Sequence, residues 1–138
     1  MEISAVVKNA GSSHEVEVRT GASSQALSVP AKVAGAGSAV NGGEFLMLAL
    51  ATCYCNDLYR EAARLKIALE RVEVEAAAQF PGAGLAATNI RYRASVSSPA
   101  PASAIEQLLR ETDAVAEVHN TVRAGVPVEF LSTVGGRR

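Results

Sequence analysis

The alternation of apolar and polar residues divides the chain into a strand-rich first third, a long helix and a mixed final part. Within residues 14–20, Val16 and Val18 alternate with charged residues. A period of two is typical of a strand with one buried face. Similar short runs, separated by Gly- and Ser-rich turns, predict antiparallel strands over residues 3–8, 14–20 and 26–30.

The clearest helix is predicted over residues 44–66, a segment rich in Ala, Leu and Met that no Gly or Pro interrupts. Its first half is apolar all round, which predicts burial on every side. In its second half, the charged side chains predicted to face water are Asp57, Arg60, Glu61 and Arg64. Residues 31–43, rich in Gly, Ala and Ser, are predicted to be the loop that leads into this helix.

The final part of the chain predicts two strands, a second helix and a closing strand. Alternating positions place the strands at residues 71–80 and 87–97. The helix is predicted over residues 101–117, with a proline at its start. The remaining predictions are a helical turn over residues 120–123, a strand over 127–131 and a frayed tail over 135–138. Together the elements predict an α+β fold in a single domain, residues 1–138.

Composition and charge narrow the class of protein. Aromatic residues make up only 4% of the chain and Trp is absent, so Ala and aliphatic side chains must fill the core and a second subunit would add burial. A net charge of -1 argues against binding to nucleic acid. The N-terminal residues lack the pattern of a signal peptide, and the longest apolar run, residues 45–55, is too short to span a membrane.

The two cysteines, Cys53 and Cys55, are separated by one residue and cannot join distant segments. This arrangement favours a reducing compartment, the cytoplasm. Two residues apart on a helix, their side chains point roughly 200° away from each other, which argues against a shared metal ion. With only two His in the chain and no phosphate-binding Gly-Lys-Ser/Thr motif, we expect neither a metal nor a cofactor.

The segment NGGEFLMLALATCYCNDLYREAARLKI resembles the OsmC/Ohr superfamily, in which a cysteine lies on a long central helix after a Gly-rich loop. The later stretch AEVHNTVRAGVPVEF resembles the closing helix and strand of that family. The resemblance covers nearly the whole chain. It implies antiparallel sheets packed around a long central helix, in an intertwined homodimer with its thiol sites at the subunit interface.

The resemblance also implies a chemistry, in which one cysteine reduces an organic hydroperoxide and a second cysteine closes a disulfide that a dithiol reopens. Cys53 falls on the peroxide-attacking position and Ala116 on the resolving position. The activating glutamate of the family corresponds to Gly43, and Glu44 matches a second acidic position. The activating arginine of the family comes from the N-terminal strands, where this chain has His14 and Arg19.

The residues around Cys53 leave its reactivity open. The thiolate is the nucleophile, and burial in an apolar helix raises a thiol pKa unless a cation offsets the effect. Asp57, one turn on, disfavours the thiolate, whereas Glu44, nine residues before Cys53, lies about 180° around the helix. His119, about one helical turn after Ala116, is a candidate base, with a capping or hydrogen-bonded surface histidine as the alternative.

Three functions are therefore open. The first is an organic hydroperoxide reductase of oxidative stress defence that uses Cys53, with Glu44 and His119 as candidate partners and a small thiol or dithiol as reductant. The second is a catalytically silent dimer of the same fold that binds small apolar ligands, with Cys53 and Cys55 as buried structural residues. The third is a small-molecule hydrolase in which Cys53 or Cys55 acts with His119.

Overall fold

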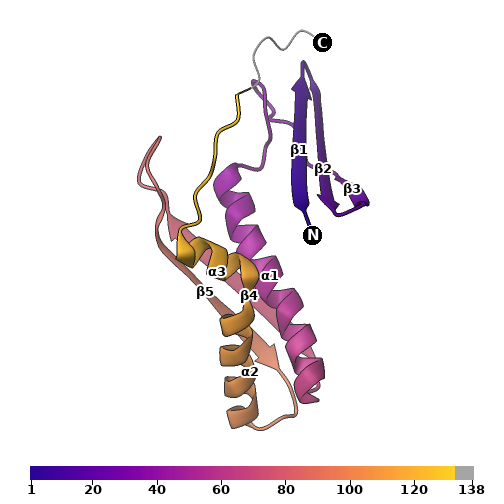
Figure 1. The fold of residues 1–138 in the computed structure, drawn as a ribbon, viewed down its shortest axis with the longest axis vertical. Helices are drawn as coiled ribbons and strands as arrows, with labels where there is room; N and C mark the ends of the chain where they lie inside the picture. The colour runs from indigo at the N-terminus through magenta and orange to yellow at the C-terminus, as the bar shows by residue number, and fades with distance from the viewer. Residues whose placement is uncertain (133–138) are drawn as a thin grey trace. The chain divides into compact units, whose positions relative to one another are not determined.

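The computed structural model describes residues 1–132, and the chain separates into two compact units, Met1–Leu46 and the part from Met47 onward. The elements are, in order, β1 (Ile3–Ala10), β2 (Ser13–Thr20), β3 (Ser23–Leu27), α1 (Gly42–Leu65), β4 (Arg71–Gln79), β5 (Thr88–Ser97), α2 (Ala102–Val115) and α3 (Glu117–Ala124) (Figure 1). The predicted α+β class, with antiparallel sheets and one long helix, is confirmed. In the described part of the chain, no helix is long and apolar enough to cross a membrane.

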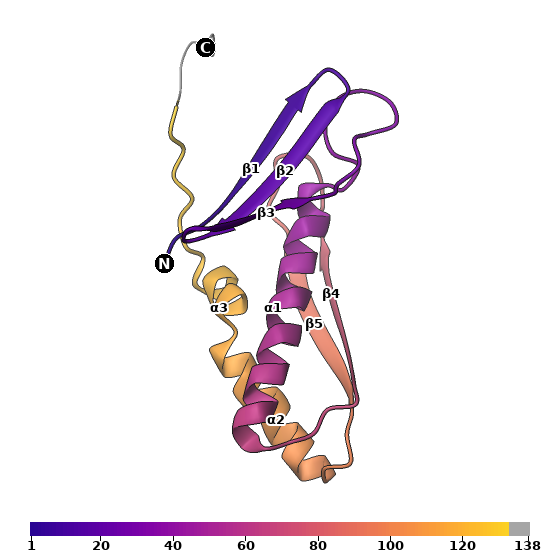
Figure 2. The same cartoon turned by 90° about the vertical axis from the view of Figure 1, so that its right-hand side faces the viewer.

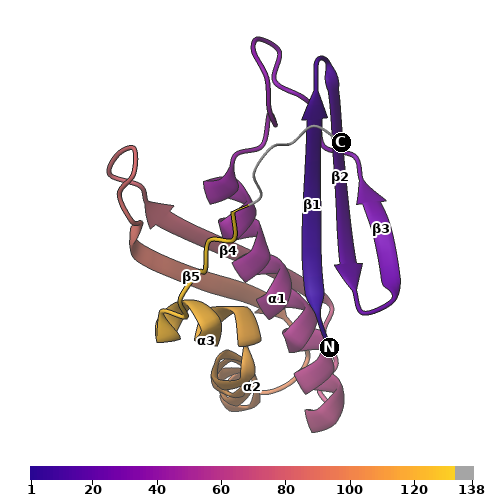
Figure 3. The same cartoon turned by 45° about the horizontal axis from the view of Figure 1, so that its top comes forward.

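The first unit contains an antiparallel sheet in the order β1-β2-β3, as Figure 3 shows. Val16 pairs with Val7 on β1 and with Leu27 on β3, so apolar side chains share one face. The third strand was predicted over residues 26–30, and this was wrong because the turn before it is shorter than expected. Gly21, with a φ of 57°, opens a two-residue turn, and pairing with β2 resumes at Ser23.

The second unit is a β4–β5 hairpin whose one face is covered by α1, α2 and α3 (Figures 1 and 2). The strands pair antiparallel, with Val72 opposite Val96. The buried residues of the core cluster are Tyr54, Leu58, Ala62, Leu108 and Ala116. The inward positions of both strands are apolar, as the alternation in the sequence predicted, and this apolar face packs against the helices.

The burial of α1 differs from the prediction in both halves. Its first half was expected to be buried all round, but Leu48 is 56% exposed in the single chain. Asp57 and Glu61 were expected to face water, yet both are buried. Each carboxylate is compensated by an arginine three residues on, at 3.1 Å for Arg60 and 2.8 Å for Arg64. The long arginine side chains reach solvent, so the pairs keep contact with water while the carboxylates are covered.

The C-terminal part also departs from the prediction. The helix expected over residues 101–117 breaks at Ala116, whose extended backbone (φ −73°, ψ 103°) separates α2 from α3. The turn expected at 120–123 is part of the two-turn helix α3, which ends at the left-handed Gly125. The strand expected over 127–131 is absent, because an alternating segment becomes a strand only where a neighbouring strand pairs with it. The predicted frayed tail lies outside the described residues.

Candidate functional site

Cys53 lies half-buried on α1, between the buried residues Leu50 and Tyr54. Its thiol donates a hydrogen bond to the carboxylate of Asp57, with 3.7 Å between Sγ and Oδ2. A spacing of four residues puts these two side chains on the same face of the helix. The backbone N–H of Val118, in the first turn of α3, lies close enough to the same sulfur to lower its pKa. The site is therefore assembled from α1 and the start of α3.

The surroundings of Cys53 favour the protonated thiol. Burial raises the pKa of the Cys53 thiol, and the hydrogen bond from the Val118 N–H opposes this effect only in part. The negative charges of Asp57 and Glu117 raise the pKa further, since each disfavours a second negative charge nearby. Within one chain, the thiol consequently has a partner for its proton but a low fraction of the reactive thiolate at neutral pH.

Replacing Asp57 with Asn is expected to make Cys53 more reactive. The substitution removes the carboxylate that raises the thiol pKa and leaves the positive charge of Arg60 in place. In a Cys55→Ser background, the pH at which the iodoacetamide alkylation rate reaches half its maximum should move down. Glu106→Gln on α2, whose carboxylate pairs with Arg110, is the control and should leave the profile unchanged. An unchanged profile in Asp57→Asn would show that this carboxylate does not govern the thiol.

Ala116 occupies the short break between α2 and α3 and is fully buried in the core. It lies two residues before Val118, whose N–H reaches the Cys53 sulfur. The segment that carries the expected resolving position thus does meet the helix that carries Cys53. What this segment supplies there is a methyl group and a backbone N–H, with no second sulfur.

Glu44 lies in the first turn of α1 and forms a capping box with Asn41. The Glu44 N–H donates to Oδ1 of Asn41 at 2.8 Å, and the Asn41 N–H donates to Oε1 of Glu44 at 2.9 Å. Two otherwise unpaired backbone donors at the start of the helix are satisfied in this way. The signal for the cap, Asn followed three residues later by Glu, is present in the sequence. A catalytic role for Glu44 stays a prediction.

His119 is only 3% exposed, so the alternative of a surface histidine is wrong. Its ring lies 4.4 Å from the Tyr92 ring and 5.9 Å from the Tyr54 ring, measured between centroids. Burial lowers the pKa of His119, and the positive charge of Arg123 lowers it further. Both effects favour the neutral imidazole over its protonated form, and the role of His119 as a base stays a prediction.

A hydrogen-bonded cluster beside His119 was missed by the sequence reasoning. The Tyr92 hydroxyl donates to the Asp113 carboxylate, and Arg123 donates to the same carboxylate at 2.6 Å. Burial raises the pKa of Asp113, but the hydrogen bonds from Arg123 and Tyr92 outweigh it and hold the pKa below its usual range. These three residues come from β5, α2 and α3, so no local sequence pattern predicts the cluster.

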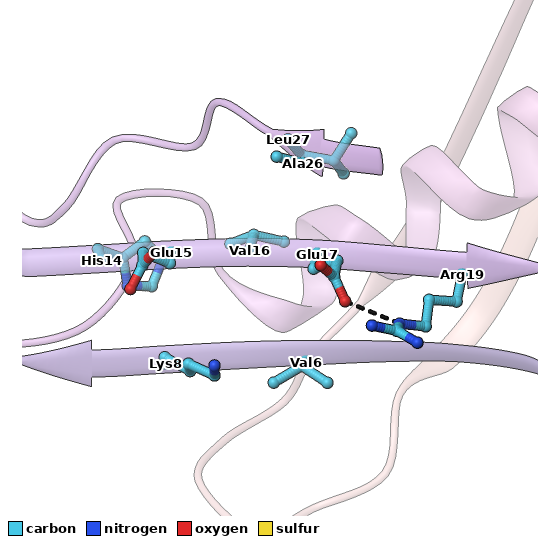
Figure 4. Close-up of a pocket in the computed structure, with 9 residues that line it drawn as sticks. All are labelled: Val6, Lys8, His14, Glu15, Val16, Glu17, Arg19, Ala26 and Leu27. Carbon is cyan, nitrogen blue, oxygen red and sulfur yellow. Dashed lines mark hydrogen bonds and ion pairs between the residues drawn. The ribbon is translucent and has the colours of Figure 1, made fainter. Parts of the chain in front are cut away.

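The two N-terminal candidates for the activating cation, His14 and Arg19, both lie on β2. They line a hollow of about 430 Å³ on the first unit, together with Lys8 on β1 (Figure 4). Arg19 forms an ion pair with Glu17 at 2.8 Å. The identity of the activating cation therefore stays a prediction.

Cys55 is a free, half-buried thiol two residues from Cys53 on α1. Among residues 1–132, no three His, Cys, Asp or Glu side chains are grouped as ligands of a metal ion.

The family described as OsmC-like protein matches residues 35–130, well over half of the chain. The chain therefore belongs to the OsmC-like protein family. The match includes α1 with Cys53 and the closing segment with Ala116. No curated protein matches this sequence.

Solved structures show the same fold at low sequence identity. An OsmC-like protein from Mycoplasma pneumoniae has a TM-score of 0.60 at 16% identity, with 88% of this chain and 86% of that chain covered. A protein from Legionella pneumophila, named as an organic hydroperoxide resistance protein OsmC, has a TM-score of 0.58 at 20% identity (89% and 90% covered). An organic hydroperoxide resistance protein from Elizabethkingia anophelis has a TM-score of 0.60 at 17% identity (89% of each chain covered).

Proposed function

We propose that this protein reduces organic hydroperoxides with a single reactive cysteine, Cys53, and an external thiol. The observation that carries the proposal is that Cys53 packs against the buried core cluster that contains Ala116, beside the first turn of α3, whose Val118 N–H lowers the thiol pKa. A backbone N–H at a helix N-terminus stabilises negative charge on a sulfur. The names of two structural relatives, both organic hydroperoxide resistance proteins, agree with this chemistry.

The reaction follows from the groups present. The thiolate of Cys53 attacks the terminal oxygen of the hydroperoxide, the O–O bond breaks, and the alcohol leaves after taking up a proton. The cysteine is then a sulfenic acid. A small thiol attacks its sulfur, water leaves, and a second thiol equivalent releases Cys53 and forms the oxidised disulfide. Ala116 has no thiol and Cys55 lies on another face of α1, so both thiol equivalents come from outside the chain. Such a cycle suits the reducing cytoplasm, where small thiols are available.

Cys53→Ser is expected to abolish hydroperoxide-dependent thiol consumption, whereas Cys55→Ser should retain it. Turnover of cumene hydroperoxide with dihydrolipoamide by the unaltered chain should be well below the median enzyme rate of about 10 per second, because the thiol pKa is raised. Trapping with dimedone, followed by mass spectrometry, should place the sulfenic acid on Cys53. Activity that survives Cys53→Ser would overturn the proposal.

We also infer that the functional form is a homodimer. Apolar side chains stay exposed in the single chain at two places: Leu48 on α1 (56%) and, after α3, Val128 (97%) and Phe130 (87%). Exposed apolar surface of this kind is unfavourable in water and is typical of an interface. The segment after α3 also retains the apolar alternation of a strand that lacks a partner.

Light scattering at low micromolar concentration should give twice the chain mass of 14.3 kDa. Leu48→Lys should shift the protein toward the monomer, since a charge would replace an apolar side chain at the interface. Gln107→Lys, at an exposed polar position on α2, is the control and should leave the mass unchanged. A folded monomer of the unaltered chain would contradict the dimer.

The raised pKa of Cys53 also favours the second candidate, a silent dimer that binds small apolar ligands. The formation of sulfenic acid on Cys53 distinguishes the two functions. If sulfenic acid never forms on Cys53 under excess hydroperoxide while the protein stays folded, the silent form is the better description.

A further inference from the structure

The reduction proposed at Cys53 requires the transfer of one proton between two atoms. The thiol has to lose its proton before the sulfur is nucleophilic. The oxygen that departs from an alkyl hydroperoxide is a strongly basic alkoxide, which leaves readily only when it is protonated. Burial and two nearby carboxylates raise the pKa of the Cys53 thiol, so the resting protein holds this proton mainly on the sulfur. A group that moves the proton from sulfur to oxygen would meet both requirements.

Asp57 has a carboxylate in contact with the sulfur. The thiol of Cys53 donates to Oδ2 of Asp57, with 3.7 Å between the two atoms. The other carboxylate oxygen, Oδ1, lies 3.1 Å from Nη1 of Arg60. The ion pair therefore holds one oxygen and leaves the other for the thiol. A general base has to lie within hydrogen-bond reach of the proton that it takes, and Oδ2 meets this condition.

The carboxylate of Asp57 is buried, whereas the cation that pairs with it reaches solvent. Asp57 is 6% exposed, and the side chain of Arg60 is 53% exposed. The charge of the carboxylate is thus compensated without a second buried charge. Because water has little access to the carboxylate, a proton on Oδ2 passes to a neighbouring group rather than to solvent.

Two other titratable groups near Cys53 differ from Asp57 in their contacts. Glu117, exposed at the start of α3, raises the thiol pKa through its charge and, among residues 1–132, not through a hydrogen bond to the sulfur. His119 is buried, but neither of its ring nitrogens has a hydrogen-bond partner within the described part of the chain. The group that accepts the thiol proton in the resting structure is therefore Asp57.

We propose that Asp57 is a catalytic residue that carries the proton in the reduction at Cys53. This inference rests on the proposed function and names the group that moves its proton. In the step, the sulfur bonds to the terminal oxygen of the hydroperoxide and the O–O bond breaks. Oδ2 of Asp57 takes the thiol proton and passes it to the departing oxygen. The terminal oxygen keeps its own hydrogen, so the products are the Cys53 sulfenic acid and the alcohol, and Asp57 is again a carboxylate.

The test compares two peroxides that differ in the basicity of the departing oxygen. Cumene hydroperoxide releases an alkoxide, whereas peroxybenzoic acid releases a carboxylate, whose pKa of about 4 removes the need for a proton. In a Cys55→Ser background, the loss of the Cys53 thiol under excess peroxide gives the rate of a single turnover. Asp57→Asn should slow the reaction with cumene hydroperoxide by about a hundredfold, the lower end of what general acid–base catalysis contributes. The reaction with peroxybenzoic acid should be no slower.

The ratio of the two rates is the decisive quantity, because it does not depend on how much of a variant is folded. Glu117→Gln is the matched control: it removes a negative charge near the thiol and leaves the proton acceptor in place, so the ratio should stay unchanged. Alkylation of Cys53 by iodoacetamide, which releases no basic oxygen, should be as fast or faster in Asp57→Asn.

Two negative results are distinguishable. If the parent protein consumes the Cys53 thiol with both peroxides but Asp57→Asn leaves the ratio of rates unchanged, Asp57 is not the proton carrier and the proposed reduction still stands. An equal fall of the ratio in Glu117→Gln would overturn the inference in the same way. If neither peroxide consumes the Cys53 thiol of the parent protein, the proposed function fails and this inference fails with it.

Discussion

In the Ala116→Cys variant, mild oxidation should link the new cysteine to Cys53. The observation behind this expectation is that Cys53 packs against the buried core cluster that contains Ala116. A disulfide requires Cβ atoms within about 4.5 Å of each other, and we expect the buried Ala116 to meet that condition with little movement of the backbone. Because the bridge closes a long loop, it should stabilise the oxidised protein by about 4 kcal/mol at most.

The link is measured by mass spectrometry of a digest, in a Cys55→Ser background, with urea unfolding of the oxidised and reduced forms. Ala114→Cys is the matched control, since Ala114 is exposed near the end of α2, two residues away. It should form far less of the intramolecular bridge. If the peptide that contains Cys53 is never linked to the peptide with the new cysteine while the protein stays folded, Ala116 does not occupy the resolving position. The proposal of a one-cysteine cycle, which rests on an alanine at the resolving position, would then lose that support.

Leu58→Ala should cost about 2–5 kcal/mol of unfolding free energy. Leu58 is fully buried on α1 and belongs to the core cluster with Tyr54 and Leu108. Truncation removes three carbon atoms from the core and leaves a cavity that the surrounding helices and strands fill only in part. This helix also carries Cys53 one turn and a half earlier, so alkylation of the thiol should become faster as the packing loosens.

Urea unfolding at one fixed protein concentration measures the effect, because the stability of a dimer depends on concentration. Leu85→Ala is the control: the same substitution is made in the β4–β5 turn, where the side chain is 62% exposed. Its cost should stay within about 0.5 kcal/mol. Equal costs for the two variants would show that α1 is not packed against the hairpin as described.

The sequence alone was sufficient to predict features that depend on local pattern. Period-two alternation predicted β2, β4 and β5 to within a few residues, because each of these strands covers one face more than the other. A short run bounded by turn residues predicted β1, whose residues are all exposed in the single chain. An uninterrupted run of strong helix formers predicted α1 in the same way. The resemblance to the family, now shown by the match over residues 35–130, placed Cys53 on that helix and Ala116 in the closing segment. None of these inferences required knowledge of which elements touch.

Burial and pairing were decided by the tertiary structure. Asp57 and Glu61 have the pattern of a solvated face, but both are buried in the folded chain, and Arg60 and Arg64 offset the cost of burying their charge. His119 is buried because α3 packs its first turn against Tyr92, a contact between residues far apart in the sequence. The segment 127–131 has the alternation of a strand yet forms none, since a strand exists only when a neighbour completes its backbone hydrogen bonds. Sequence periodicity shows which side of a helix or strand is apolar. Which other element covers that side depends on how segments far apart in the sequence pack together.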